Sequence, residues 1–221
     1  MPLPRILEPE VMDTEKDAVE YDAMDFAEVN LAFAQRALDL VSMKGRRTIL
    51  DVGTGTARIP ILIAQLATEE LNIVGVDLSS EMLKVAEKNV LNAGLSKRIS
   101  LQLVDAKKLV FDARSFDMVI SNSLVHHIPE PGVIFSEVAR AVKPGGSIFI
   151  RDLMRPESDE QLDMLVRQYA GDADEYQQKL FRDSLHAALT IPEVRDLLQR
   201  AGIEDARVVQ SSDRHWSVEK L

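Results

Sequence analysis

Short apolar runs rich in β-branched residues recur along the chain, and stretches with helical spacing separate them. The runs cover residues 48–52, 72–76, 99–104, 116–121 and 147–151. Continuous apolar runs of this length are typical of strands covered on both faces, with the intervening helices supplying the cover. The pattern therefore predicts a parallel α/β sheet.

The last third of the chain carries clear boundary signals. One helix begins with the capping-box pattern Thr190-Ile191-Pro192-Glu193 and ends at Gly202. Two late strands are predicted after it, over 206–209 and 216–218. The expected order is thus β-α-β-α-β-β-α-β, followed by an insert, a helix and these strands.

Two segments lie outside this regular order. Residues 1–45 carry an apolar helical stripe, and residues 153–189 form a polar insert with helical character. Open α/β sheets bind ligands at the carboxyl ends of their strands, and both segments can cover that edge. We expect them to form a lid.

Composition limits the classes of function. A chain of 221 residues suits one well-buried domain, and no apolar run is long enough to cross a bilayer. The N-terminus lacks the continuous apolar stretch of a secretory signal, so a cytoplasmic protein is expected. The formal charge is −10 and the basic residues do not cluster, which argues against a nucleic acid partner. The absence of cysteine excludes disulfides and thiolate metal sites.

The turn after the first apolar run contains Gly53 and Gly55. Their missing side chains let the backbone turn sharply and approach a ligand, and the helix that follows presents free N–H groups. A purely structural turn is the alternative. Arg58 stands where the dinucleotide fingerprint needs a third glycine, which weakens that interpretation. Asp51 can brace the turn by accepting N–H bonds, or it can face a cationic part of a ligand.

Acidic residues end the next two strands. Asp77 has the spacing of a carboxylate that accepts both hydroxyls of a ribose, although it could instead cap the next helix. Because Ser79 and Ser80 can cap that helix without help, we favour the ribose role. Asp105 and Ala106 place an acceptor beside a small residue, which suits a flat adenine ring.

These features belong to a longer series: Asp51-Val52-Gly53-Thr54-Gly55-Thr56-Ala57, Asp77-Leu78-Ser79, Asp105-Ala106, Phe116-Asp117-Met118-Val119-Ile120-Ser121-Asn122 and Val142-Lys143-Pro144-Gly145-Gly146-Ser147. Together these motifs resemble those of the class I S-adenosylmethionine-dependent methyltransferases. The chain is most similar to the small-molecule branch that includes the ubiquinone and menaquinone biosynthesis methyltransferases. The likeness covers residues 45–152 closely and the helix from 190 to 202, with the strand after it, more loosely.

The resemblance implies a Rossmann-like, doubly wound α/β sheet of seven strands, mostly parallel, with the last strand antiparallel. It also implies a single methyltransferase domain over residues 1–221. We expect that domain to comprise a helical N-terminal lid (1–45), the cofactor-binding core (46–152), a helical insert (153–189) and a C-terminal helix with strands (190–221).

The resemblance further implies S-adenosylmethionine as cofactor and S-adenosylhomocysteine as product. By motif position, Gly53 and Gly55 pass beneath the methionine part, and Asn122 lies near the sulfonium. Ala57 departs from the family, in which many members carry a third glycine there, but a methyl group is a mild change. The predicted cofactor-binding residues are Tyr21, Asp51, Gly53, Thr54, Gly55, Asp77, Leu78, Asp105, Ala106 and Asn122.

Methyl transfer from a sulfonium is an in-line displacement, so aligning the reactants and excluding water are the main tasks. An acceptor of high pKa also needs its proton removed. We predict Asn122 and His127 as the residues at the reaction, with His127 as base or acceptor-orienting group. A structural role for His127 in the loop is the alternative. Adjacent His126 and His127 are not expected to face the same way, and without a third ligand we predict no metal site.

Three other polar features have competing interpretations. Tyr21 either closes over the cofactor, as a tyrosine-bearing segment does in related enzymes, or packs as an ordinary aromatic. For Arg151, Asp152 and Arg155, a mutual ion pair is favoured over recognition of an anionic acceptor. His186 is expected to be structural.

The leading hypothesis is methyl transfer to an O, N or C atom of a small molecule. An NAD-dependent oxidoreductase and a cofactor-binding protein without turnover are the alternatives. The sequence leaves the acceptor and the oligomeric state open, and it predicts no membrane span.

Overall fold

The structure is a computed structural model that describes residues 3–8, 13–41 and 47–221. Parts of the predicted N-terminal lid, at 1–2, 9–12 and 42–45, and the first core residue, at 46, lie outside the described residues.

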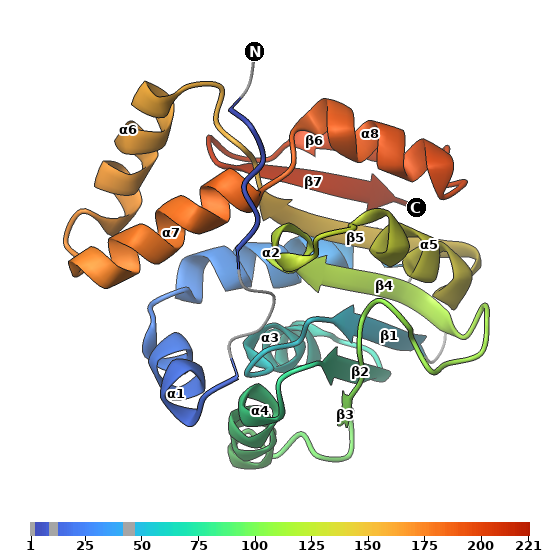
Figure 1. Cartoon of the computed structure of the whole chain (residues 1–221). Coiled ribbons are helices and arrows are strands. Elements are labelled where there is room, and N and C mark those ends of the chain that lie inside the picture. The colour runs from blue at the N-terminus through green and yellow to red at the C-terminus, as the bar shows by residue number, and fades with distance from the viewer. Residues whose placement is uncertain (1–2, 9–12, 42–46) are drawn as a thin grey trace.

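The predicted sheet is confirmed. Its seven strands lie in the order β3-β2-β1-β4-β5-β7-β6, and β7 is antiparallel to both of its neighbours while the other pairs are parallel (Figure 1). The strand β5 is longer than predicted at both ends. The strands are β1 (Arg47–Val52), β2 (Leu71–Asp77), β3 (Ile99–Leu103), β4 (Phe116–Asn122), β5 (Val142–Leu153), β6 (Arg207–Gln210) and β7 (His215–Lys220).

Helices cover both faces of the sheet. One apolar cluster joins α2, α3 and α4 to alternate strand residues such as Ile49 and Phe149, and the other joins α5 and α8 to the residues between them, such as Leu50 and Ile148. No helix in the described ranges is long and apolar enough to cross a membrane. The helices are α1 (Glu15–Ala23), α2 (Ala27–Leu40), α3 (Arg58–Leu66), α4 (Ser80–Asn92), η1 (Val125–His127), α5 (Gly132–Ala141), α6 (Asp159–Ala170), α7 (Glu175–Ala187) and α8 (Ile191–Arg200).

The predicted capping box at the start of α8 is confirmed. The Thr190 hydroxyl accepts the Glu193 N–H, while the Glu193 carboxylate accepts the Thr190 N–H at 2.7 Å. The helix stops before Gly202, whose φ of +72° is the left-handed conformation that glycine adopts most readily. Local sequence chemistry therefore fixes both ends of this helix.

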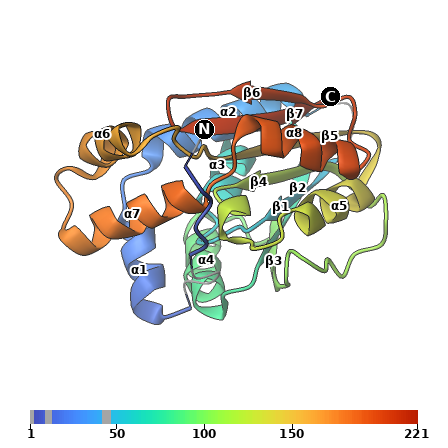
Figure 2. The same ribbon diagram turned by 45° about the horizontal axis from the view of Figure 1, so that its top comes forward.

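The elements outside the regular order gather at one edge of the sheet. Figure 1 shows α1, α6 and α7 beyond the arrowheads of β1, β2, β4 and β5, at the carboxyl edge. Residues 3–8 pass between α7 and the loop after β4, as Figure 2 also shows. There the Arg5 side chain donates to the carbonyls of Ala187, at 2.7 Å, and Ile128, at 2.8 Å. This N-terminal segment therefore bridges two parts of the edge.

The helix α2 belongs to the core. Phe33 is completely buried and stacks on Phe149 of β5, with the ring centroids 4.4 Å apart. The same helix places Ala34, Ala37 and Leu40 in the cluster beneath the sheet. The lid stays a prediction, and within the N-terminal part of the chain it would involve α1 and residues 3–8 rather than α2.

Replacing Phe33 with alanine tests the place of α2 in the core. Loss of a buried phenylalanine leaves a cavity, so the free energy of unfolding should fall by about 3–5 kcal/mol. Leu31→Ala on the same helix is the matched control, because Leu31 is 38% exposed and its loss should cost less than about 1 kcal/mol. Urea unfolding measures both, and equal effects would contradict the core assignment.

Candidate functional site

A pocket opens at the carboxyl edge between β1, β2, β3 and β4. It brings together residues from five separate stretches of the chain, around positions 21, 53–55, 76–82, 104–106 and 122–128. Its lining residues are Tyr21, Gly53, Gly55, Val76, Asp77, Leu78, Ser79, Met82, Val104, Asp105, Ala106, Asn122, Ser123, Leu124, His127 and Ile128. Nine of the residues predicted for the site are in this set: Tyr21, Gly53, Gly55, Asp77, Leu78, Asp105, Ala106, Asn122 and His127.

The glycine turn is held by β2. The N–H groups of Gly53 and Thr54 both donate to the carbonyl of Val76, each at 2.9 Å. Gly53 has a φ of +76°, and a Cβ there would lie 3.0 Å from the side chain of Leu124. Both the backbone conformation and the neighbouring pocket wall therefore require glycine at this position.

Asp77 ties the glycine turn to the start of α4. Its carboxylate accepts the Gly55 N–H at 2.7 Å through one oxygen and the Ser79 N–H at 2.9 Å through the other. The Ser79 hydroxyl caps α4 by accepting the Met82 N–H, so the serine is the cap, as expected. Burial raises the pKa of Asp77, although the backbone N–H groups partly offset it. Each oxygen retains a lone pair that can accept a ligand hydroxyl.

Asp51 and Thr54 lie behind the pocket rather than on its wall. The carboxyl of Asp51 is buried beside the Thr54 hydroxyl, and none of the backbone N–H groups in the described ranges donates to it, so the predicted bracing of the turn through N–H bonds is not seen. Burial raises its pKa to about 7; the Thr54 hydroxyl lowers it, and Asp77 raises it further. Thr54 packs its hydroxyl against Gly75, where a Cβ would meet it at 2.7 Å. Of the two roles predicted for Asp51, facing a cation is the one still open.

Tyr21 lies over the glycine turn. Its ring is 3.7 Å from the position that a Cβ on Gly55 would take. Burial, together with the nearby charges of Asp77 and Asp51, raises the pKa of Tyr21 to about 12, so the phenol stays protonated and can donate a hydrogen bond. The tyrosine reaches from α1 over the glycine turn, which is predicted to pass beneath the cofactor, as a covering residue would.

Arg58, which weakened the dinucleotide interpretation, has a partner on α1. Its guanidinium donates to both carboxylate oxygens of Asp22, at 2.8 and 2.7 Å. Asn89 of α4 donates to the same carboxylate at 3.0 Å and to the carbonyl of Thr56 at 3.0 Å. Since Asp22 follows Tyr21 directly, this network holds the tyrosine above the glycine turn.

The end of β3 forms the far wall. Asp105 accepts the Lys107 N–H at 2.8 Å and lies 3.1 Å from the Lys107 ammonium. Ala106 is almost buried beside it, and Leu78 is exposed at the rim. Together they leave an acceptor next to apolar surface, the arrangement expected for a flat heterocycle.

Asn122 ends β4 and borders the pocket. Arg151 of β5 holds its side chain, donating from Nε to the Asn122 amide oxygen at 2.9 Å. The next residue, Ser123, has a φ of +55°, a strained conformation of the kind that gathers at ligand sites. The strand therefore ends abruptly and turns the chain along the pocket wall.

The ion pair expected among Arg151, Asp152 and Arg155 is not formed. Burial lowers the pKa of Arg151 to about 10, and this side chain packs over Phe33, 4.9 Å from the ring centroid. Arg155 pairs instead with Glu193 at 2.5 Å. Arg151 and Asp152 are consecutive on β5, so their side chains point to opposite faces of the sheet, and Arg155 lies beyond the end of the strand.

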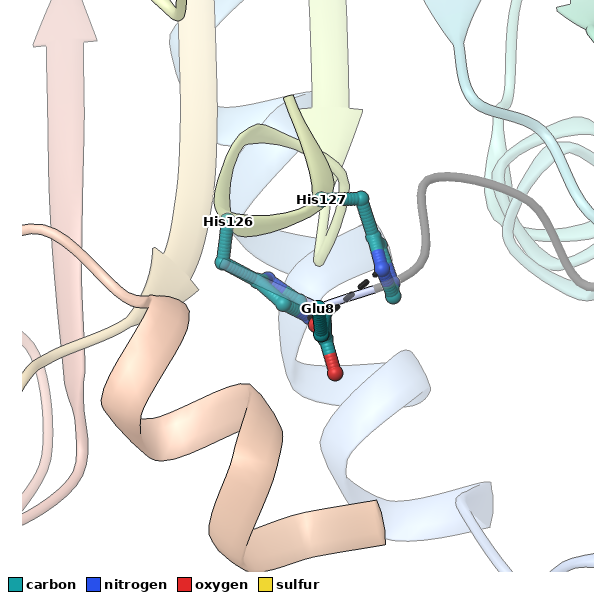
Figure 3. Close-up of side chains that lie close together, drawn as sticks. All are labelled: Glu8, His126 and His127. Carbon is teal, nitrogen blue, oxygen red and sulfur yellow. Dashed lines mark ion pairs between the residues drawn. The ribbon is translucent and has the colours of Figure 1, made fainter. Parts of the chain in front are cut away.

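The two adjacent histidines, contrary to expectation, face the same way. The tight 3₁₀ turn η1 sets their ring centroids 4.1 Å apart, and both rings approach Glu8 of the N-terminal segment (Figure 3). The distances from Glu8 Oε1 are 3.1 Å to His127 Nδ1 and 3.5 Å to His126 Nε2. His127 lines the pocket, whereas His126 is buried behind it.

Asp152 anchors this histidine pair. Its carboxylate binds His126 Nδ1 and also accepts the Val125 N–H at 2.5 Å. Burial lowers the pKa of His126, but Asp152 and Glu8 outweigh that effect and raise it above the ordinary value. Burial likewise raises the pKa of Glu8, and the histidines outweigh this and lower it. Glu8 is thus an ionised carboxylate within a largely buried polar cluster.

Sequence reasoning missed several members of the site. Val76 is the last residue but one of β2, Val104 directly follows β3, and Leu124 and Ile128 flank η1, so nearness to the strand ends was an available signal. Met82 of α4 is both buried and part of the pocket wall. Glu8 and Asp152 gave no such signal, because only the folded chain brings them to the histidines.

The chain is similar to known proteins in sequence and in fold. A family model described as a methyltransferase domain matches residues 44–202, well over half of the chain. A demethylmenaquinone methyltransferase from Desulfitobacterium hafniense is 26% identical over 204 residues, which cover 86% of this chain and 80% of that relative. A phosphatidylethanolamine N-methyltransferase from Cereibacter sphaeroides is 35% identical over 130 residues, 59% of this chain and 61% of that one. A solved SAM-dependent methyltransferase from Aquifex aeolicus is 21% identical, with a TM-score of 0.68, covering 93% and 97% of the two chains.

The fold and the family match define the class: the chain belongs to the methyltransferase-domain family. Within it, the chain is a class I S-adenosylmethionine-dependent methyltransferase of the small-molecule type, which sets the NAD-dependent alternative aside. Its cofactor is S-adenosylmethionine; two solved neighbours of the same fold contain this molecule or S-adenosylhomocysteine. The chain spans only about three fifths of the Cereibacter relative, so its acceptor is a separate question.

Asp51→Asn should make the protein without cofactor more stable at high pH. The folded pKa of Asp51 is about 7, above the unfolded value near 4. Its stabilising contribution is therefore present below the unfolded pKa and lost as pH rises through the folded pKa. The difference in free energy of unfolding, variant minus wild type, should therefore increase by roughly 1–4 kcal/mol between pH 4 and pH 8.

Urea unfolding at several pH values measures this difference. Asp112→Asn is the control, because Asp112 is exposed on the loop before β4 and its substitution should shift stability equally at every pH. A constant difference between Asp51→Asn and wild type would show that Asp51 ionises normally in the folded state.

Proposed function

We propose that the protein transfers a methyl group to an O, N or C atom of a small molecule, with its cofactor in the pocket at the carboxyl edge. The observation that carries the proposal is the convergence of Gly53, Gly55, Asp77 and Asp105 on one pocket. The residues come from the ends of β1, β2 and β3. A structural glycine turn would use Asp77 to hold its backbone, but it would not need Asp105.

The residues that line the pocket suit S-adenosylmethionine in their charge and hydrogen-bonding groups. Asp77 offers two carboxylate oxygens for ribose hydroxyls, and Asp105 with Ala106 suits the adenine. The glycine turn has no side chain on the pocket side, which leaves room for the methionine part, and Tyr21 covers it. The buried Asp51 carboxyl gains a partner if a cationic group of the ligand lies near it.

S-adenosylmethionine supplies an electrophilic methyl group on a sulfonium. The chain's own contribution is to place the acceptor and keep water away. Asn122, held by Arg151, provides a fixed amide beside the reaction, and Leu124 and Ile128 form an apolar wall. His127 borders the same space and can orient an acceptor or accept its proton.

The comparisons leave the acceptor open across chemical classes. The relative from Desulfitobacterium bears the name of a demethylmenaquinone methyltransferase, and that from Cereibacter the name of an amine methyltransferase. A panel of phenols, amines, carboxylic acids and reduced quinones covers these possibilities. Formation of S-adenosylhomocysteine, followed by mass spectrometry, reports any acceptor that is used. Tight cofactor binding without turnover on that panel would instead favour a binding protein.

Asp77→Asn should abolish most cofactor affinity. The amide cannot accept the Gly55 and Ser79 N–H groups and two ribose hydroxyls in the same way, so the dissociation constant for S-adenosylhomocysteine should rise at least about 10-fold. Calorimetry measures it. Asp112→Asn removes a surface carboxylate and should leave the affinity unchanged. Unaltered binding by Asp77→Asn would remove the ribose assignment.

His127→Asn should slow turnover much more than it weakens cofactor binding. Loss of a proton-accepting or orienting group at the reaction costs about 10²-fold or more in kcat. The dissociation constant for S-adenosylhomocysteine should change less than about 3-fold, because His127 is proposed to act on the acceptor. His215→Asn on β7 is the control. Normal turnover by His127→Asn would assign the histidine to the loop structure.

A further inference from the structure

Three potential metal ligands converge next to the pocket, and Figure 3 shows the side chains of Glu8, His126 and His127 close together. Glu8 Oε1, a nitrogen of His126 and a nitrogen of His127 all lie within 4.8 Å of one another. The side chains of Glu8 and His126 are only 6% and 4% exposed. Neither Glu8 Oε1 nor His127 Nδ1 has a hydrogen-bond partner in the described part of the chain, although both atoms are buried. Buried polar atoms without partners are costly and indicate a missing interaction.

Asp152 prepares His126 to be a ligand. A carboxylate only accepts hydrogen bonds, so its contact with Nδ1 places a proton on that nitrogen and directs Nε2 toward Glu8. Metal-binding histidines commonly donate their other N–H to a carboxylate in this way, which fixes the ring and increases its basicity. Asp152 is itself held by the Val125 N–H at 2.5 Å, so the orientation is built into the loop.

The spacing matches a small tetrahedral site. With metal–ligand distances of about 2.0–2.1 Å, two ligands of a tetrahedral zinc ion lie roughly 3.3 Å apart. The Glu8 oxygen is 3.1 Å from His127 Nδ1 and 3.5 Å from His126 Nε2. An ordinary salt bridge would instead align an N–H with the carboxylate, and the 3.1 Å contact does not meet that geometry.

We propose that Glu8, His126 and His127 form a binding site for a divalent transition metal ion, with zinc as the closest match. Two imidazoles and one carboxylate suit zinc, whereas magnesium and calcium prefer oxygen ligands alone. The earlier expectation of no metal site rested on the lack of a third ligand. Glu8 supplies it from a segment more than one hundred residues away in sequence.

The place of the site suggests its use. His127 also lines the cofactor pocket, so a three-ligand metal ion would have a further coordination position available to an oxygen of the acceptor. A bound hydroxyl loses its proton more readily, which favours phenols or other hydroxyl acceptors. This use rests on the proposed function, whereas metal binding itself does not. The ion would also tie residues 3–8 to η1.

Metal binding is measured directly on tag-free protein stripped with a chelator. Calorimetry with Zn²⁺ should give one equivalent per chain, and Co²⁺ should give the visible absorption of a tetrahedral site. Glu8→Gln and His127→Asn should each weaken binding at least about 10-fold, and Asp152→Asn about 10–100-fold. His215→Asn, a histidine away from the cluster, should bind as the wild type does.

Two results would overturn the site: no saturable binding of either ion, or binding that survives both Glu8→Gln and His127→Asn. If the buried Asp152 variant fails to fold, those two variants and the Co²⁺ spectrum of the unaltered protein still decide. Titrating the stripped protein with S-adenosylhomocysteine separates the proposals. Normal cofactor binding without metal binding rejects only the metal site, and metal binding without cofactor binding rejects only the proposed function.

Discussion

The pocket depends on the carboxylate of Asp77, which connects two segments of its wall. Through one oxygen it fixes the glycine turn after β1, and through the other it fixes the backbone that leads into α4. Gly55 and Asp77 are 22 residues apart in sequence, and this single side chain sets the spacing between the turn and the start of α4. Because the group is buried, its pKa is raised, and the two N–H bonds are what keep the charge tolerable. A ligand hydroxyl would add to the same stabilisation.

Asp51 and Asp77 lie near each other in the site, and within the described part of the chain both lack a cationic partner. Asp51 is buried with a pKa near 7, and the charges of Asp51 and Asp77 both raise the pKa of Tyr21. Placing such groups together costs folding free energy, which a cationic ligand recovers on binding. The positive charges of the sulfonium and ammonium groups of S-adenosylmethionine are therefore a reason for clustering these acidic residues. The expected consequence is that the protein without cofactor is less stable.

The parts of the site that could be predicted are those for which sequence position fixes spatial position. In a parallel sheet, neighbouring strands end at one edge, so Gly53, Asp77, Asp105 and Asn122 were bound to meet. The start of the helix at Thr190 could also be predicted, because a capping box is a local sequence pattern. Tyr21 was predicted only by resemblance, and its support by Arg58 and Asp22 was invisible, because α1 reaches the turn by tertiary packing alone.

The histidine cluster shows the opposite case. Its members come from residue 8, the turn after β4 and the end of β5, and no periodicity links these three places. The interpretation of adjacent histidines as diverging assumed an extended chain, in which neighbours alternate. The two histidines lie instead in the 3₁₀ turn η1, where their ring centroids are 4.1 Å apart and the ring planes are tilted by 36°.

The pocket and its surroundings are thus built from two groups of chain segments. The cofactor side comes from residues 53–122, all within the stretch that the family model matches. Tyr21 and Glu8, which reach the pocket and His127 from the N-terminal side, lie before that stretch. An enzyme family can keep one cofactor while changing acceptors if the acceptor side is assembled from segments outside the shared core. In this chain, the residues that fix chemical specificity should accordingly be sought where residues 3–8, α1 and the loop after β4 meet, rather than in the glycine turn.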